Sequence, residues 1–238
     1  SVALILLHLA ARGNKALMVS LSGRFVQPLH HALAKLNSHV PFSVAELIWA
    51  LGVIVAVVYI ILQIILLILR KDRLKRVYII FKTLLSIAAF IYAMFCMLWG
   101  TYYYGDDFQS RSGIESRDIS AEELAVVTEY FALRANEYAD KVMRNEDGFY
   151  VCDREAILAR SDEVFDAVVE DYPSLYGPRV RAKGIFFSRV MSYTNFTGFF
   201  FPFTAEANVN TDFPPALFAS TVAHELSHQL LTVCTGVS

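Results

Sequence analysis

The chain has 238 residues, of which 55% are hydrophobic and 18% charged, and its mean hydropathy is +0.43. This composition excludes a disordered chain, a collagen-like repeat and a disulfide-dense mini-protein, and it is unusual for a cytosolic protein. The net charge of −2 hides a division: residues 1–100 carry 10 Lys/Arg and 2 Asp/Glu, whereas residues 101–238 carry 11 and 21. We therefore expect a membrane anchor over residues 1–104 and a separate domain outside the bilayer over residues 105–238.

The first residues are apolar but too few to cross a membrane. Val2 to Leu9 form this short run, and Arg12 and Lys15 close it. We interpret it as the end of a first span whose beginning is missing. A signal peptide is the less favoured alternative, because its basic residues would precede the apolar run.

Residues 22–40 have the spacing of an amphipathic helix, which we expect to lie along the outer membrane interface. Its apolar positions are Phe25, Val26, Leu29, Leu33 and Leu36. The histidines of this segment are expected on the polar face, and we do not predict that they bind a metal. They are His30, His31 and His39.

Two long apolar segments follow, and each is long enough to cross a hydrocarbon core of about 30 Å as a helix. They cover residues 44–69 and 77–99. Residues 70–76 between them hold five basic side chains, which predicts a cytoplasmic loop. Residues 10–43 and the chain after Gly100 would then lie outside. The second span is expected to leave the bilayer through an aromatic belt of Trp99, Tyr102, Tyr103 and Tyr104.

The second half is predicted to combine helices with a small sheet. Residues 120–123 form a capping box that starts a long helix, and a second helix is expected over residues 153–171. The runs 185–190 and 199–201 are typical of β-strands and predict a hairpin or small sheet with an exposed edge. A last helix is expected to begin at residues 212–215.

This last helix carries the motif His224-Glu225-Leu226-Ser227-His228. Two histidines four residues apart on a helix project from one face and can bind a single Zn²⁺ ion. The glutamate between them can take the proton of an attacking water and pass it to a leaving amine. The motif predicts zinc-dependent peptide hydrolysis, with His224 and His228 as metal ligands and Glu225 as the catalytic base. A surface helix with two solvated histidines is the alternative.

A resemblance to a known family supports this prediction. Residues 198–210, together with residues 224–229, resemble an uncharacterised bacterial family of membrane-anchored proteins that are expected to be zinc metallopeptidases. The order of segments from Phe25 to Gln229 is similar as well, including the Trp-Gly-x-Tyr-Tyr sequence at the exit of the second span. The resemblance implies a gluzincin-like site with the zinc ligands and the general base named above.

One departure from that family concerns the third zinc ligand. The family continues after the motif into a further helix, where a glutamate supplies this ligand. No Asp or Glu follows Glu225 here, so we expect a truncated C-terminus, a missing ligand and impaired activity. Cys234 is a weak candidate ligand, and none of the three cysteines belongs to a paired motif. Glu206 and Asn208 are expected to shape a turn, with substrate contact as the weaker option.

The sequence thus predicts an α+β protein: a transmembrane helical hairpin, optionally with a truncated first span, followed by a zincin-like domain of helices and a small sheet. The predicted function is zinc-dependent hydrolysis of peptide or protein substrates outside a bacterial cell membrane. The protein is expected to be multi-pass, in contact with the lipid bilayer and without a nucleic-acid partner. Two alternatives remain: a non-catalytic membrane protein with a partner-binding domain, and a zinc sensor that uses His224 and His228.

Overall fold

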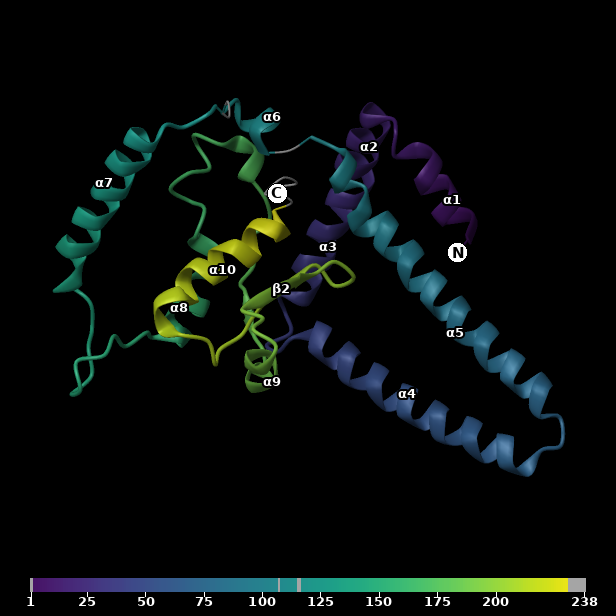
Figure 1. The fold of residues 1–238 in the computed structure, drawn as a ribbon. Coiled ribbons are helices and arrows are strands. Elements are labelled where there is room, and N and C mark those ends of the chain that lie inside the picture. The colour runs from purple at the N-terminus through teal and green to yellow at the C-terminus, as the bar shows by residue number, and fades with distance from the viewer. Residues whose placement is uncertain (1, 107, 115–116, 231–238) are drawn as a thin grey trace.

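A computed structural model describes residues 2–106, 108–114 and 117–230 of the chain. This part of the protein is mostly helical and contains one small sheet of three strands. Two long helices project as a hairpin, and the sheet and the last helix lie at the open end of that hairpin (Figure 1). The combination of helices with a small sheet agrees with the predicted α+β composition.

The hairpin consists of α4 (Val44–Leu69) and α5 (Arg73–Phe95), and α5 continues through the π-helical turn η2 (Cys96–Gly100). Both helices are long and apolar enough to cross a membrane, and little of either apolar stretch is buried inside the protein. Ser43 begins α4, because its side chain accepts a hydrogen bond from the Glu46 amide. Both predicted spans lie within these helices.

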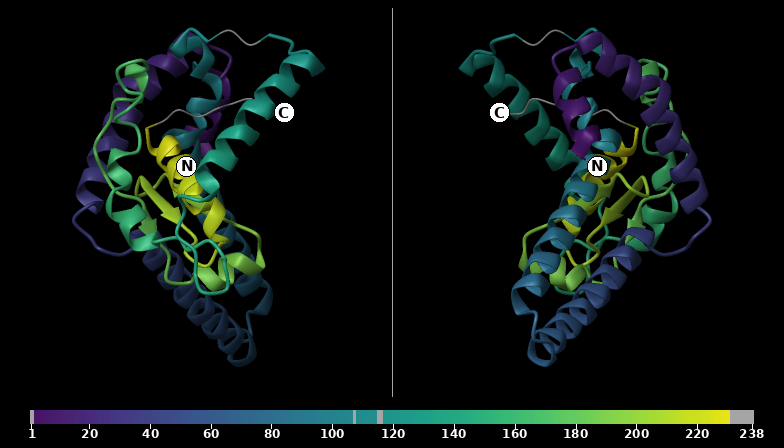
Figure 2. Two further views of the ribbon diagram at one scale, coloured as in Figure 1. Left: turned by 90° about the vertical axis from the view of Figure 1, so that its left-hand side faces the viewer. Right: turned by 90° about the vertical axis from the view of Figure 1, so that its right-hand side faces the viewer.

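Further helical segments precede the hairpin. They are α1 (Val2–Ala11), α2 (Lys15–Leu21), the π-helical η1 (Ser22–Val26) and α3 (Gln27–Asn37). Segments α2, η1 and α3 follow one another without a break, so the predicted helix over residues 22–40 begins earlier and ends at Asn37. Helix α1 packs against α5 and η2, and two views at right angles to Figure 1 show it beside α5 (Figure 2).

The prediction that the histidines of this helix lie on a polar face is wrong for His30. Val26, His30 and Ala34 are buried, whereas Phe25 and Leu36 of the predicted apolar stripe are exposed. His30 is buried because residues distant in the sequence pack on its side of the helix. The rings of Tyr102 and Phe200 lie against His30, and Ala205 packs against Ala34.

The long helix after the hairpin is α7 (Ala121–Ala139), and its predicted capping box is confirmed. The Ser120 side chain accepts from the Glu123 amide, and the Glu123 carboxylate accepts from the Ser120 amide. No residue of α7 is buried, and its apolar side chains are exposed. The short helix α6 (Phe108–Ser112) and the 3-10 turn η3 (Tyr102–Tyr104) lie between the hairpin and α7.

The predicted helix over residues 153–171 is shorter in the structure. It forms α8 (Arg154–Ala159), which is followed by the 3-10 turns η4 (Ser161–Glu163) and, further on, η5 (Pro173–Leu175). The Ser161 hydroxyl donates to the Leu158 carbonyl and accepts from the Ala182 amide. A serine that bonds to the backbone in this way competes with the helical ladder and ends the helix.

The sheet has the strand order β1-β3-β2. Its strands are β1 (Lys183–Gly184), β2 (Gly198–Phe201) and β3 (Glu206–Val209), with β3 parallel to β1 and antiparallel to β2. The predicted strand over residues 199–201 is confirmed as β2, which lies at one edge of the sheet. Strand β3 was not predicted.

Residues 185–190, predicted as a strand, instead lead into the short helix α9 (Ser188–Tyr193). The Ser188 hydroxyl donates to the Ile185 carbonyl at 2.6 Å and accepts from the Thr211 amide at 2.8 Å. These bonds, one local and one from Thr211 elsewhere in the chain, fix a turn at the point where a strand would have to continue, and they override the preference of the run for a strand.

Helix α10 (Pro215–Gln229) lies against the sheet and closes the core. The buried apolar side chains of this core come from β3, from α10 and from the segment before β1. They are Ala182, Ala207, Val209, Phe218, Val222 and Leu226. At the end of α10 the side-chain amide of Gln229 donates a hydrogen bond to the Ala205 carbonyl at 2.8 Å. This bond holds the β2–β3 turn, where Ala205 has a φ of 54°.

Candidate metal centre on helix α10

The HExxH motif lies in the last two turns of α10. The sheet packs against Val222 and Leu226 of this helix, and these contacts fix the rotation of the helix about its axis. Because an α-helix has 3.6 residues per turn, His224 and His228 share one face. The three predicted site residues are therefore brought together on one element.

The two histidine rings lie close together on this face, and their Nε2 atoms are within hydrogen-bond distance of each other. Their Nε2 atoms are 3.1 Å apart, and the ring centroids are 4.7 Å apart with perpendicular planes. Zinc–nitrogen bonds of about 2.0–2.1 Å at the tetrahedral angle place two ligand nitrogens about 3.3 Å apart. The pair therefore fits zinc as two of its ligands with only a small adjustment of the rings.

Glu225 points toward the sheet and is only 4% exposed. It lies against Gly198 at the start of β2, where a side-chain carbon would come within 2.7 Å of Glu225 Cγ and 2.8 Å of Oε1. The close approach of strand and carboxylate thus requires glycine. Among the described residues the carboxylate accepts no hydrogen bond, and burial raises the pKa of Glu225 to about 7. Such a group can exchange a proton near neutral pH.

His228 is half-buried and lies edge-on to the indole of Trp99, with ring centroids 5.9 Å apart. Burial, and secondarily the neighbouring His224, lowers the pKa of His228 and favours the neutral imidazole that binds metals. Its Nδ1 atom is buried without a hydrogen-bond partner in the described part of the chain. Metal-binding histidines usually donate their second N–H group, so this supporting contact is missing here.

A third protein ligand is not found near this pair. Within residues 2–106, 108–114 and 117–230, no three His, Cys, Asp or Glu side chains are grouped so that they could hold a metal ion. The described residues thus supply two donors, and catalytic zinc sites normally have three protein ligands. The prediction for Cys234 lies outside the described residues.

Glu206 and Asn208 lie in β3 and point to the start of α4, away from the histidine pair. The Glu206 carboxylate accepts hydrogen bonds from the Val44 and Ala45 amides at 3.1 and 2.8 Å. The Asn208 side chain accepts from the Ser43 hydroxyl at 2.6 Å. Their function in the structure is to hold the N-terminus of α4, where a helix presents unpaired amides and favours negative charge.

Lys183 also lies at this junction between the sheet and the start of α4, and the sequence did not indicate it. Its ammonium group is 2.6 Å from Glu206 Oε1 and also donates to the carbonyls of Asn37 and Phe42. The two side chains are 10% and 3% exposed, so this is a buried ion pair. Lys183 and Glu206 are each the first residue of a short strand, and no local pattern in the sequence pairs them.

The aromatic residues at the end of α5 are divided between two environments. Trp99 is 9% exposed and packs against Phe200 of β2, with ring centroids 5.1 Å apart, and against Tyr102 at 6.0 Å. Tyr103 is 52% exposed and accepts a hydrogen bond from the Trp99 indole. Part of the predicted belt thus supports the wall of the candidate site.

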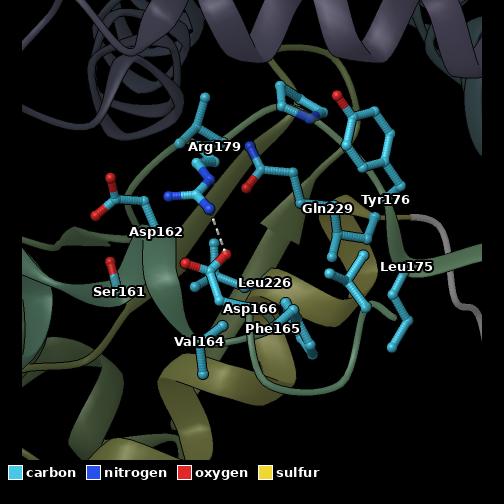
Figure 3. Close-up of a pocket in the computed structure, with 15 residues that line it drawn as sticks. Ser161, Asp162, Val164, Phe165, Asp166, Leu175, Tyr176, Arg179, Leu226 and Gln229 are labelled. Atoms are coloured by element: carbon cyan, nitrogen blue, oxygen red, sulfur yellow. Dashed lines mark ion pairs between the residues drawn. The ribbon is translucent and has the colours of Figure 1, made fainter. Parts of the chain in front are cut away.

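A separate cavity of about 90 Å³ lies on the side of α10 opposite the histidine pair. Leu226, Gln229 and Leu230 line it, together with residues from the segments 161–169 and 175–180, and an ion pair joins Arg179 to Asp166 at its rim at 2.9 Å (Figure 3). His224, Glu225 and His228 do not line this cavity, and we assign no chemistry to it.

Residues 22–231 match the model of the family described as protein of unknown function (DUF3810). The match covers most of the chain, and the protein therefore belongs to this family. The comparisons with curated proteins and with solved structures gave no match.

Proposed function

We propose that this protein is a membrane-anchored zinc metallopeptidase that hydrolyses peptide bonds outside the cytoplasmic membrane of a bacterium. The observation that carries the proposal is the 3.1 Å separation of the His224 and His228 Nε2 atoms, with a buried Glu225 between them on the same helix. Two facing imidazoles at this distance, next to a carboxylate, are the ligand pair and the base that metal-assisted hydrolysis requires.

In this proposal His224 and His228 hold the metal, and Glu225 moves the proton. Bound zinc would polarise the peptide carbonyl and make a water molecule easier to deprotonate. Glu225 takes a proton from the water that attacks the carbonyl carbon and returns it to the leaving amine nitrogen when the C–N bond breaks.

The sheet offers a place for the substrate. Strand β2 is an edge strand of the described sheet and begins at Gly198, directly against Glu225. An extended peptide that added to this edge would place its backbone next to the base. Backbone pairing selects for extended conformation more than for side-chain identity, so we expect unfolded or extended peptides as substrates.

The membrane part of the proposal rests on the two hairpin helices. We propose that α4 and α5 span the bilayer, with the basic residues 70–76 in the cytoplasm and the sheet and α10 on the opposite side. Trp99, at the end of the second span, packs on His228, so the histidine pair would lie close to the membrane surface.

The proposal is tested with Glu225→Gln, which retains the shape of the side chain and removes the proton acceptor. In zinc-containing buffer we expect hydrolysis of an unstructured peptide to fall by about 10²–10⁴-fold while bound zinc, measured by mass spectrometry, is unchanged. Glu129→Gln, an exposed exchange on α7, is the matched control. Equal rates for wild type and Glu225→Gln would show that this glutamate is not the base.

The zinc site has its own test in His224→Ala and His228→Ala, each of which should abolish zinc binding. His39→Ala, at an exposed histidine, is the control. Because the described residues provide two ligands, we expect wild type to lose zinc on mild chelation. Zinc that survives dialysis against EDTA would reveal a third ligand.

A second candidate is a non-catalytic protein whose domain binds a partner or senses zinc. The observation that favours it is the apolar face of α7, which is exposed over the whole length of the helix. A sensor would bind zinc without turnover and would respond equally to zinc in the Glu225→Gln variant. A partner-binding protein would bind no zinc.

A further inference from the structure

Residues 186–196, which we call the α9 loop, expose an unusual amount of apolar side chain. The exposed large side chains are Phe186 (86%), Phe187 (49%), Val190 (61%), Tyr193 (80%) and Phe196 (61%). Protein surfaces that face only water rarely gather so many large apolar groups in so short a segment. The loop is therefore expected to contact something less polar than water.

The charge of the loop points to the kind of partner. It contains no acidic residue, and Arg189, which is exposed, is its sole basic residue. Aromatic and aliphatic side chains with an occasional arginine are typical of segments that rest in the headgroup region of a bilayer, where rings and cationic groups are both accommodated.

The position of the loop is fixed relative to α4. The two carboxylate oxygens of Glu46, in the first turn of α4, accept hydrogen bonds from the Phe187 amide at 2.7 Å and the Phe186 amide at 2.9 Å. This bidentate contact places the start of the loop at the level where α4 leaves the domain, and helix α9 lies beside that end of α4 (Figure 1). Trp49, one turn further along α4, is 61% exposed.

We propose that the α9 loop is a membrane-contact element whose exposed apolar side chains enter the lipid headgroup region around α4. This inference rests on the proposed membrane-spanning function of α4, and it adds a second, monotopic contact that the hydropathy of the chain does not indicate. The occupant is the lipid bilayer, because the loop is continuous with the surface of a proposed span and carries no acidic group that lipid phosphates would repel.

The contact would also position the candidate site. Phe196 is two residues before Gly198, the glycine that lies against Glu225. A loop held in the headgroup region therefore keeps the β2 edge at the membrane surface. This geometry favours one class of substrate: membrane proteins, cleaved in an extended segment that lies close to the substrate's own transmembrane span.

The test places a polarity-sensitive fluorophore on single cysteines in an otherwise cysteine-free full chain in liposomes. Val190→Cys and Tyr193→Cys both report on the loop. Two variants are used so that the test still stands if one of them does not fold. Met143→Cys is the matched control, because Met143 is apolar and 62% exposed, like Val190 at 61%. Val57→Cys, in the middle of α4, reports on the span.

We expect the loop labels to show blue-shifted emission, quenching by lipids that carry a spin label near the headgroup, and protection from aqueous iodide. The Met143 label should show none of these. Loop labels that behave like the Met143 label, while the Val57 label is quenched by lipid, would overturn the contact and leave the span intact. Protection from iodide without quenching by lipid would mean that protein covers the loop, and it would overturn the proposal. Iodide access to the Val57 label would overturn the span and the contact with it.

Discussion

His30 shows how far the environment of one residue can depart from what its type suggests. It has no exposed surface and lies between Tyr102 and Phe200, with ring centroids 6.2 and 5.7 Å away. Neither ring nitrogen reaches a hydrogen-bond partner in acceptable geometry within the described residues, and the nearby Pro202 carbonyl only partly offsets the effect of burial. Burial lowers the pKa of His30 to about 4, so the residue is neutral in the folded protein at physiological pH.

This environment predicts that stability falls on acidification. The folded-state pKa of about 4 is below the unfolded value of about 6.5, so the stabilising effect of a neutral His30 is complete above pH 6.5. Between pH 6.5 and pH 4 this histidine binds a proton in the unfolded chain but stays neutral in the folded protein. The loss is about 1.4 kcal/mol per pH unit, or about 2 kcal/mol between pH 7 and pH 5.

The measurement is the free energy of unfolding in detergent at pH 7 and pH 5, for wild type and for His30→Phe. Phenylalanine suits the aromatic surroundings and does not titrate, so the variant should lose about 2 kcal/mol less than wild type over this range. His39→Phe, at an exposed histidine, controls for the substitution itself. If wild type and His30→Phe lost the same unfolding free energy between pH 7 and pH 5, His30 would not be the source of the pH dependence.

At the scale of elements, the structure is organised by the junction between the sheet and α4. Glu206 and Asn208 of β3 receive hydrogen bonds from the first residues of the helix, and Glu46 of the helix receives two from the α9 loop. These bonds run in both directions between one proposed span and the domain. The orientation of α4 relative to the sheet is therefore set by directional contacts as well as by packing.

The ion pair between Glu206 and Lys183 is expected to be essential to this junction. Glu206→Gln leaves the lysine charge buried and unpaired, which should destabilise the protein by about 3–5 kcal/mol. The double variant Lys183→Met, Glu206→Gln contains no unpaired charge and should recover part of this loss. Thermal and denaturant unfolding in detergent measure both effects.

The matched control is Glu163→Gln, which removes the acidic partner of Arg160 in an exposed pair. Its effect should be within about 1 kcal/mol, because solvent screens exposed ion pairs. If Glu206→Gln were as mild as this control, the buried pair would not hold the start of α4.

For the molecule as a whole, the arrangement of hairpin and domain restricts the topology. Both ends of the hairpin meet the domain, and the basic turn lies at the far tip (Figure 1). If α4 and α5 span a membrane, the turn and the domain must lie on opposite sides. The charge of residues 70–76 then assigns the turn to the cytoplasm and the domain to the exterior.

Cysteine labelling in intact cells tests this assignment. In a cysteine-free background, Met143→Cys should react with a membrane-impermeant reagent, whereas Asp72→Cys should react only after the cells are permeabilised. Both positions are exposed, so accessibility to the reagent depends on the side of the membrane. The reverse pattern would invert the topology, and labelling of both residues in intact cells would contradict a spanning hairpin.

Much of the element content could be predicted because it depends on neighbours in the chain. The hairpin follows from two uninterrupted apolar runs, the start of α7 from the pair Ser120 and Glu123, and the facing histidines from a spacing of four residues on a helix. Each of these patterns lies within one continuous segment of the chain, so the sequence determines them directly.

What the tertiary structure decided depends on contacts between distant residues. Ser43 bonds to Asn208, 165 positions away, and Glu46 to the Phe186 amide, 140 positions away. The burial of His30 and the replacement of a predicted strand by α9 have the same kind of cause, because a polar or aromatic partner from elsewhere in the chain overrides the local pattern. The sequence alone determined which residues form the hairpin and the HExxH helix. Only the fold decided that Gly198 lies against Glu225 and that the first turn of α4 is joined to the sheet, since these contacts form when segments far apart in the chain pack together.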